Sequence, residues 1–202
     1  DALADSGYAQ NDSLLARTGV ILGNLSFPTR SSNALFTDLY RLILGKALSD
    51  KFGTTITLSP TPSEKSDIAN GLSSGYPSAM IAHALGLGAG HLALDAACAS
   101  SLYAVGLAGY YLATGKADMM LAGAVSAADP LFVNMGFAHI TGYPENNGDS
   151  LPLDARSEGL IAGEGAGMFV LKRLSDSGRD YERIYGLVSG LGVSNGIQGK
   201  HS

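Results

Sequence analysis

Short apolar runs alternate with helix-like segments along this chain. The apolar runs are rich in β-branched or small residues and predict strands at 18–25, 91–97, 118–126, 163–174 and 184–194. Helical spacing of leucines predicts a helix over 35–48, and a second helix should begin at Tyr76 and end at Gly86. Most of the strands are continuously apolar rather than alternating, which is typical of a mostly parallel sheet with helices on both faces.

The stretch 91–115, HLALDAACASSLYAVGLAGYYLATG, joins a predicted strand, a turn and a helix. No residue from Ser100 to Thr114 is charged and apolar residues fall on every side, so the pattern predicts a helix that is buried all round. Cys98, the single cysteine of the sequence, lies in the turn before that helix. Free N–H groups and the positive end of the helix dipole favour a thiolate there, so we predict that Cys98 is a nucleophile.

Two further roles in the turn follow from the same geometry. The backbone N–H of Cys98 is expected to act as an oxyanion donor. Asp95 is expected to accept backbone N–H groups within the turn rather than to act in catalysis. Composition alone favours a different interpretation of Cys98, as a small, buried and inert side chain.

Composition and charge narrow the classes of function. The chain has 202 residues, 46% of them hydrophobic and 27 of them glycine, which suits a globular domain with a full core. Its net charge of -5 and its scattered Lys and Arg residues give no support to nucleic-acid binding. A lone cysteine excludes an intrachain disulfide and fits a cytoplasmic location. The uncharged run 96–115 is long enough for a membrane span, but its glycines and polar flanks favour a buried helix and no membrane partner.

The glycine-rich segment 163–167, GEGAG, precedes its predicted strand and contains no lysine. It therefore lacks the features of a phosphate-binding loop. We interpret its glycines as positions that permit close packing or an unusual backbone where the strand enters the core, and Glu164 would need a partner if it were buried.

Three motifs resemble the β-ketoacyl synthase family of condensing enzymes. They are DAACASSLYAV around Cys98, GKADMMLAGAVSAADPLFVNMGF after it, and PLDARSEGLIAGEGAGMFVLKRL. The resemblance covers about 18–194. Within the family, GNLSFPT at 23–29 and ADPLFVNMGF are similar to the ketosynthase domains of polyunsaturated fatty acid synthases, which are polyketide-synthase-like multienzymes.

This resemblance implies a thiolase-like α/β fold in α-β-α-β-α layers, built from two similar halves and usually dimeric. The chain would be a partial ketosynthase domain. Residues of about 1–150 would form its N-terminal lobe, and residues of about 151–202 would begin the C-terminal lobe.

The family's reaction supplies the expected roles of individual residues. An acyl group passes from an acyl carrier protein or coenzyme A to a cysteine, and the carbanion left when a malonyl thioester loses CO₂ attacks it. The resemblance assigns the nucleophile to Cys98 and part of the acyl pocket to Phe137 in VNMGF. It implies no metal or organic cofactor, because phosphopantetheine arrives on the acyl carrier protein. The other implied partners are the acyl and malonyl thioesters, further synthase domains and a second copy of the chain.

The sequence departs from the family in two respects, the first of which is that Gly196 and Ile197 stand in the tail where the family usually has Asp-Gly. The second concerns the catalytic histidines. The family's two catalytic histidines lie in motifs of the HGTGT and NIGH type, and neither motif occurs here. The chain alone is therefore not expected to condense. Two alternatives stay open: a thiolase or chain-initiating synthase that transfers acyl groups without malonyl chemistry, and a non-catalytic subunit that shapes chain length. Subunits of the second kind generally lack the cysteine.

Overall fold

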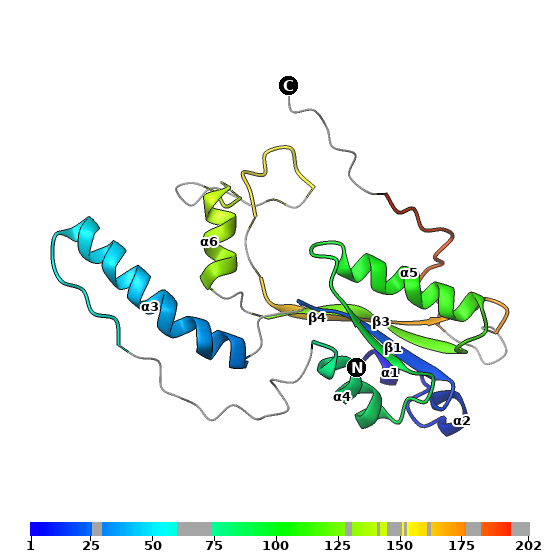
Figure 1. Ribbon diagram of the computed structural model, residues 1–202. Coiled ribbons are helices and arrows are strands. Elements are labelled where there is room, and N and C mark those ends of the chain that lie inside the picture. The colour runs from blue at the N-terminus through cyan, green and yellow to red at the C-terminus, as the bar shows by residue number, and fades with distance from the viewer. Residues whose placement is uncertain are drawn as a thin grey trace.

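A four-stranded sheet lies at the centre of the computed structural model (Figure 1), which describes residues 1–25, 30–59, 74–127, 131–140, 142–144, 151, 153–160, 163–176 and 183–194. The strands are β1 (Thr18–Gly23), β2 (His91–Leu94), β3 (Met119–Ser126) and β4 (Gly165–Lys172). The helices are α1 (Ala2–Asp5), α2 (Asp12–Leu15), α3 (Arg30–Phe52), α4 (Tyr76–Leu85), α5 (Ser100–Ala113) and α6 (Leu131–His139).

The sheet has the strand order β2-β1-β3-β4 and is mostly parallel, as predicted. β1 runs parallel to β2, with Val20 opposite His91, and parallel to β3, with Val20 opposite Leu121. β4 is antiparallel to β3. Every residue of β1 is buried, because strands flank it on both sides and helices cover both of its faces.

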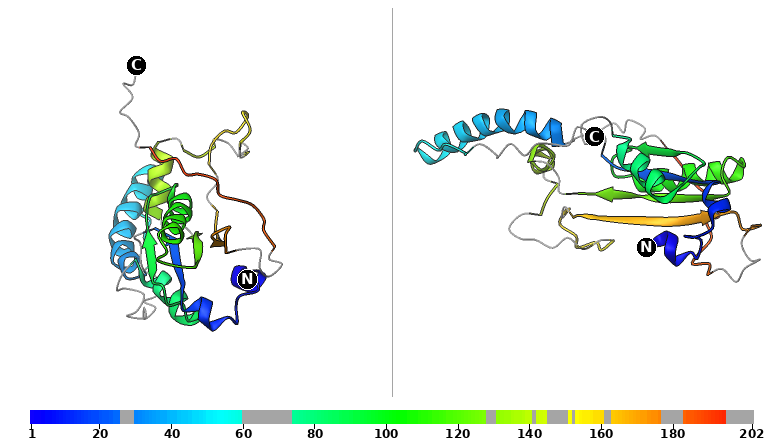
Figure 2. Two further views of the ribbon diagram at one scale, coloured as in Figure 1. Left: turned by 90° about the vertical axis from the view of Figure 1, so that its right-hand side faces the viewer. Right: turned by 90° about the horizontal axis from the view of Figure 1, so that it is seen from below.

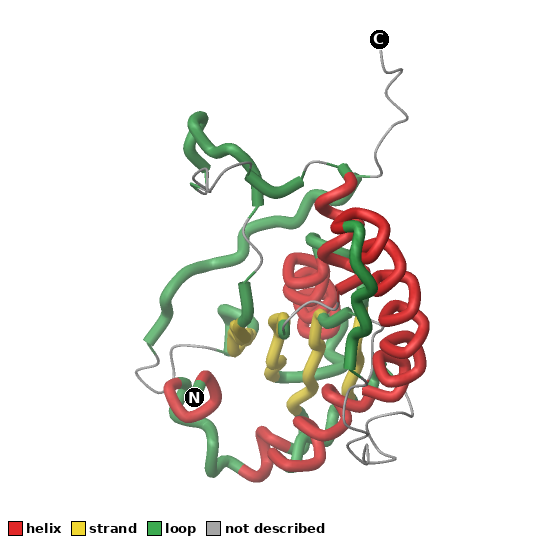
Figure 3. Tube along the Cα trace, turned by 90° about the vertical axis from the view of Figure 1, so that its left-hand side faces the viewer, coloured by secondary structure: helices red, strands yellow, loops and turns green. Residues whose placement is uncertain are grey.

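Helices cover both faces of the sheet, and a separate hydrophobic core lies on each face. α5 lies on one side and α1, α2 and α4 lie on the other (Figures 1 and 2), and Figure 3 shows the strands between the two groups. Successive residues of a strand point to opposite faces, so Ile21 and Met120 belong to the α5 core while Val20 and Met119 belong to the other. The predicted arrangement of helices on both faces is confirmed.

The prediction that the helix after Cys98 is buried all round is wrong. Its buried residues recur every fourth position and form one ridge against the sheet: Ser100, Ala104, Ala108 and Leu112. Leu102, Tyr103 and Tyr110 are 66%, 40% and 54% exposed on the other sides of α5. Small and apolar residues around the whole helix gave no polar face to mark its exposed side.

The strand predicted at 184–194 is also wrong. Residues 183–194 form no strand in the described structure, and part of this segment crosses α5, where Leu191 packs onto Gly106. The other predicted strands are present and are shorter than predicted by a few residues. The helix predicted at 35–48 is also present and forms the middle of the longer α3. The proposed division into lobes near residue 150 falls at 145–150, outside the described residues, and stays a prediction.

Candidate active site

Cys98 lies in an exposed turn between the end of β2 and the start of α5. The strand, turn and helix predicted around it are all present, and Cys98 is not the buried side chain that composition alone favours. Ala99 is the N-cap residue of α5, and no side chain caps the helix there. The N–H of Cys98 donates to no other described residue. Unpaired N–H groups at a helix start can stabilise negative charge, which is what an oxyanion donor and a thiolate both require.

Two side chains fix the backbone of this turn. Asp95 Oδ1 accepts a hydrogen bond from the N–H of Ala97 at 3.0 Å, as predicted for that carboxylate. Ser100 Oγ accepts one from the N–H of Ala96 at 2.9 Å and donates one to the carbonyl of Ala97 at 2.7 Å. Ala97, held on both sides, has a φ of 50°, a left-handed conformation that is uncommon for alanine.

The end of β1 backs the start of α5. A Cβ atom added at Gly23 would lie 2.8 Å from Ser100 Cβ and 3.0 Å from its carbonyl carbon, so only glycine fits at this strand end. The next residue, Asn24, donates its backbone N–H to the carbonyl of Leu94 at 3.0 Å, which joins the ends of β1 and β2. Strand ends and helix start therefore support the Cys98 turn together.

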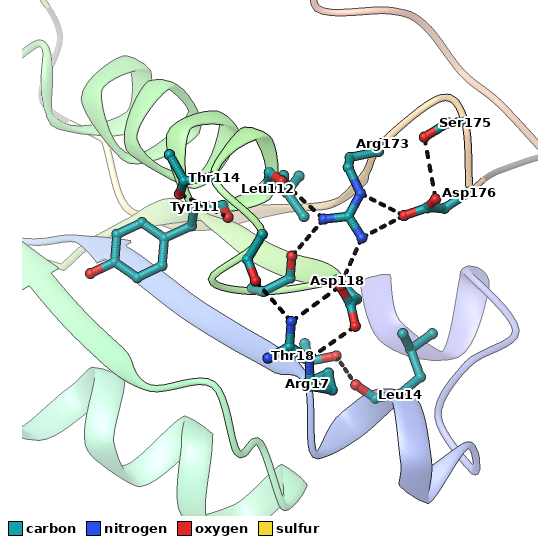
Figure 4. Close-up of polar contacts among 12 residues, drawn as sticks. Leu14, Arg17, Thr18, Tyr111, Leu112, Thr114, Asp118, Arg173, Ser175 and Asp176 are labelled. Atoms are coloured by element: carbon teal, nitrogen blue, oxygen red, sulfur yellow. Dashed lines mark hydrogen bonds and ion pairs between the residues drawn. The ribbon is translucent and has the colours of Figure 1, made fainter.

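An ionic cluster holds the opposite end of α5 (Figure 4). We define the Asp118 cluster as Arg17, Asp118, Arg173 and Asp176. Arg17 Nε lies 2.9 Å from one carboxylate oxygen of Asp118, and Arg173 Nη2 lies 2.7 Å from the other. Arg173 also donates from Nε to Asp176 at 2.6 Å. One carboxylate thus joins the residue before β1 to the residue after β4.

The same guanidinium groups bind backbone carbonyls where α5 ends. Arg173 Nη1 donates to the carbonyls of Leu112 and Ala117, at 2.9 Å and 2.8 Å. Arg17 Nη2 donates to the carbonyl of Gly115 at 2.8 Å. Leu112 lies in the last turn of α5, where its carbonyl also accepts the N–H of Gly115 at 3.1 Å, and Gly115 and Ala117 follow the helix. The positive charge of the two guanidinium groups complements the negative end of the helix dipole.

The Asp118 cluster changes the acidity of its members. Hydrogen bonds from Arg17, and then from Arg173, lower the pKa of Asp118 to about 2. The hydrogen bond to Asp118 is the main cause that raises the pKa of Arg173. The carboxylate therefore stays ionised well below neutral pH.

Phe137 lies on α6, which stands clear of the sheet in Figure 1. Its ring is 6.0 Å from the ring of Tyr143, and its carbonyl accepts the N–H of Gly142 at 2.8 Å. Tyr143 is itself held by a hydrogen bond from its hydroxyl to Asn134 Oδ1 at 2.7 Å. The described ring contact and hydrogen bond of Phe137 are thus with the segment after α6, and its role in an acyl pocket stays a prediction.

The remaining candidate groups are spread over the molecule. His83, His91 and His139 are exposed on α4, β2 and α6, and His201 is outside the described residues. Among the residues with described positions, no three His, Cys, Asp or Glu side chains are grouped as metal ligands. Nor does any helix in the described ranges have the length and apolar character needed to cross a membrane.

The prediction that the glycines of 163–167 permit close packing or an unusual backbone is wrong, because nothing lies within 4 Å of a Cβ atom added at Gly163, Gly165 or Gly167 and none of them has a positive φ. The close packing here depends instead on a glycine of the neighbouring strand. A Cβ atom added at Gly123 of β3 would lie 1.9 Å from the carbonyl oxygen of Gly167 in β4. The close approach of these two backbones therefore depends on the absence of a side chain at Gly123. Glu164 is exposed and needs no buried partner.

Sequence reasoning missed Ser100, Gly23 and the Asp118 cluster. Ser100 could have been found as a small polar residue at the first position of a helix that follows a tight turn. The cluster gives no local signal, because Arg17 and Asp118 are 101 residues apart.

Comparison with known proteins gives consistent similarities. Residues 1–177 match the family model of the beta-ketoacyl synthase N-terminal domain. A polyunsaturated fatty acid synthase subunit of Thraustochytrium sp. is 36% identical over 183 residues, which are 89% of this chain and 9% of that protein. The pikromycin polyketide synthase component PikAIII of Streptomyces venezuelae is 34% identical over 146 residues, 70% of this chain and 9% of that protein.

Solved structures show the same relationship. The structure of the PfaC keto synthase-chain length factor is 55% identical with a TM-score of 0.72, over 91% of this chain and 20% of that one. The ketosynthase from module 6 of the bacillaene synthase from Bacillus subtilis 168 is 27% identical with a TM-score of 0.59, over 92% of this chain and 27% of that one. The chain therefore spans only a small part of the proteins it resembles.

Proposed function

The chain belongs to the β-ketoacyl synthase family, whose thiolase-like α/β fold its sheet and helices share, and we propose on that premise that Cys98 carries the acyl group in a condensing reaction. The observation that supports this role is the exposure of Cys98 at the uncapped start of α5. The first step is acyl transfer. The Cys98 sulfur bonds to the carbonyl carbon of an acyl thioester, and the donor thiol leaves with the proton of Cys98.

The second step forms the new carbon–carbon bond. A malonyl thioester loses CO₂, the resulting carbanion attacks the acyl carbon on Cys98, and the Cys98 thiolate leaves as the β-ketoacyl product forms. The carbanion needs groups that polarise the malonyl carbonyl, a role that the family's two catalytic histidines would fill. We therefore assign this step to the full-length protein, with Phe137 lining the acyl pocket.

The partners follow from this chemistry. Acyl and malonyl groups would arrive on the phosphopantetheine of an acyl carrier protein, so the chain itself would need neither a metal nor an organic cofactor. We expect it to act in the cytoplasm, within a homodimer and beside other domains of a fatty acid or polyketide synthase.

Labelling the full-length protein with a radioactive acyl thioester tests the proposed function. The label should map to the peptide that contains Cys98 and should be absent from Cys98→Ala. Circular dichroism of the variant serves as the control for folding. Label on another residue, or label that persists in Cys98→Ala, contradicts the proposal.

A second candidate is a subunit that shapes chain length without catalysis, and one observation raises it. The solved structure with 55% identity is that of a keto synthase-chain length factor. Subunits that only shape chain length generally lack the cysteine, so an exposed Cys98 favours the catalytic role. Release of CO₂ from a malonyl thioester by the purified full-length protein would exclude the non-catalytic role. Acyl transfer without this release would instead favour a thiolase-like acyltransferase.

A further inference from the structure

Ser100 occupies a buried position two residues after Cys98. It is 8% exposed, whereas Cys98 and Ser101 on either side of the helix start are exposed. Its hydroxyl both accepts and donates within the turn: it accepts the N–H of Ala96 at 2.9 Å and donates to the carbonyl of Ala97 at 2.7 Å. The hydroxyl therefore closes a ring of hydrogen bonds around the backbone that leads into Cys98.

The residue under most strain in this turn is Ala97, immediately before Cys98. Its φ of 50° lies in the left-handed region, which alanine adopts only when its surroundings impose it. Asp95 holds the N–H of Ala97 and Ser100 holds its carbonyl. The peptide group between Ala97 and Cys98 is thereby oriented, and this orientation sets the direction in which the Cys98 side chain leaves the backbone.

Ser100 is itself seated against the sheet. Gly23 at the end of β1 leaves no room for a Cβ atom, which would approach Ser100 Cβ to 2.8 Å. Contact with the strand end thus fixes the position of Ser100, and its hydroxyl in turn fixes the backbone of the turn. A side chain without the hydroxyl would keep this contact and lose the two hydrogen bonds.

We propose that Ser100 is a positioning residue, whose hydroxyl holds Ala97 in the left-handed conformation and so presents the thiol of Cys98 to its substrate. This inference rests on the proposed role of Cys98 and adds a second residue to that site. The hydroxyl touches no substrate and acts only through the backbone of Ala96 and Ala97.

The test compares Ser100→Ala with Ser101→Ala in the full-length protein. Both variants remove one hydroxyl from the first turn of α5, and Ser101 is the exposed neighbour with no described hydrogen bond from its side chain. Acylation of Cys98 by an acyl thioester, followed by mass spectrometry in a single turnover, should slow at least tenfold in Ser100→Ala. In Ser101→Ala it should stay within twofold of the wild-type rate.

A rescue variant separates positioning from general destabilisation. Glycine adopts a positive φ without strain, so Ala97→Gly combined with Ser100→Ala should restore acylation to within threefold of the wild-type rate. A rate in Ser100→Ala within twofold of wild type, or a double variant as slow as Ser100→Ala, overturns the proposal. If Ser100→Ala does not fold, the double variant is compared with Ala97→Gly alone, and a rate difference above tenfold between them overturns it.

Alkylation by iodoacetamide distinguishes failure of this proposal from failure of the proposed function. If the wild-type protein is not acylated at Cys98, the proposed function is wrong. The alkylation rates of Cys98 in the same variants still test its positioning, with the same order expected. Equal alkylation rates in all of them would then overturn the role of Ser100.

Discussion

The two ends of α5 are held by different kinds of interaction. At the N-terminal end, Ser100 and Asp95 bind the backbone of an exposed turn, and no side chain caps the helix. At the C-terminal end, Arg17 and Arg173 bind backbone carbonyls and share the carboxylate of Asp118. Hydrogen bonds of one serine and one carboxylate fix the first end, and a network of full charges fixes the second.

This difference suits the roles of the two ends. A capping carboxylate at the start of α5 would occupy the N–H groups that a thiolate or an oxyanion needs, and it would repel negative charge there. Cations at the far end match the helix dipole and lie about 20 Å away, at 1.5 Å per residue. The charges that anchor the C-terminal end of α5 therefore lie far from Cys98, and the carboxylate near the Cys98 turn, Asp95, binds the N–H of Ala97 rather than the helix start. We expect damage at the first end to reduce reactivity and damage at the second to reduce stability.

Substitution of Gly23 should produce the largest effect. In Gly23→Ala the new methyl group overlaps Ser100 and its backbone, so we expect a loss of about 3 kcal/mol in stability from overpacking and a strong fall in the alkylation rate of Cys98. Hydrogen exchange of the α5 amides and iodoacetamide labelling measure the two effects.

Gly109→Ala is the matched control, because nothing lies within 4 Å of a Cβ atom at this position in α5. It should stabilise the helix by about 0.5–1 kcal/mol and leave labelling of Cys98 unchanged. Normal labelling in Gly23→Ala would show that the strand end does not support the reactive turn.

Substitution of Arg173 should destabilise the C-terminal end of α5, with a smaller loss of stability than in Gly23→Ala. Arg173→Met leaves the carbonyls of Leu112 and Ala117 without their charged donor, and a loss of about 2 kcal/mol is expected for such hydrogen bonds. Thermal denaturation measures this loss. Arg156→Met removes the same charge from an exposed pair with Asp154 and should change stability little. A fall in Cys98 labelling as large as that of Gly23→Ala would contradict the division of roles between the two ends.

Low pH should weaken the Asp118 cluster, and this should produce the smallest loss of stability of the three changes. The pKa of Asp118 is lowered to about 2 in the folded chain, below its value in the unfolded chain. Its contribution is therefore complete above a pH of about 4 and is lost as the pH falls from about 4 to about 2. Because the carboxylate is partly exposed, we expect a contribution of about 1 kcal/mol.

Denaturation curves over that pH range measure this contribution, with Asp118→Asn as the comparison. The variant should be less stable than the wild type at neutral pH, and the gap should narrow towards pH 2. A gap that stays constant over the range would show that the ionised carboxylate contributes nothing.

The sequence predicted what depends on local pattern and missed what depends on distant contacts. Apolar runs identified β1, β2, β3 and β4, although only β1 and the first five residues of β3 are buried and the edge strands β2 and β4 are exposed or half-buried. The same rule failed at 184–194, since an apolar run becomes a strand only when a neighbouring strand pairs with it. Burial of α5 was overestimated because its exposed tyrosines and leucines resemble core residues.

The candidate site divides in the same way. The exposed turn position of Cys98 and the acceptance of a backbone N–H by Asp95 could be predicted, because strand, turn and helix follow one another directly along the chain. The contact of Gly23 with Ser100 joins residues from separate elements, and no spacing rule connects them. The left-handed φ of Ala97 could not be predicted from the sequence either, because glycine is the residue that usually marks such a conformation and alanine does not.

That backbone conformation limits which amino acids the position can hold. Valine, isoleucine and threonine branch at Cβ and are poorly tolerated at a positive φ, whereas glycine, asparagine and aspartate adopt it more readily. An aspartate there would add a negative charge directly beside the thiol and oppose its ionisation. Few amino acids therefore suit position 97, and they are small or uncharged. The geometry of the turn thus restricts variation at a residue whose side chain carries no chemistry of its own.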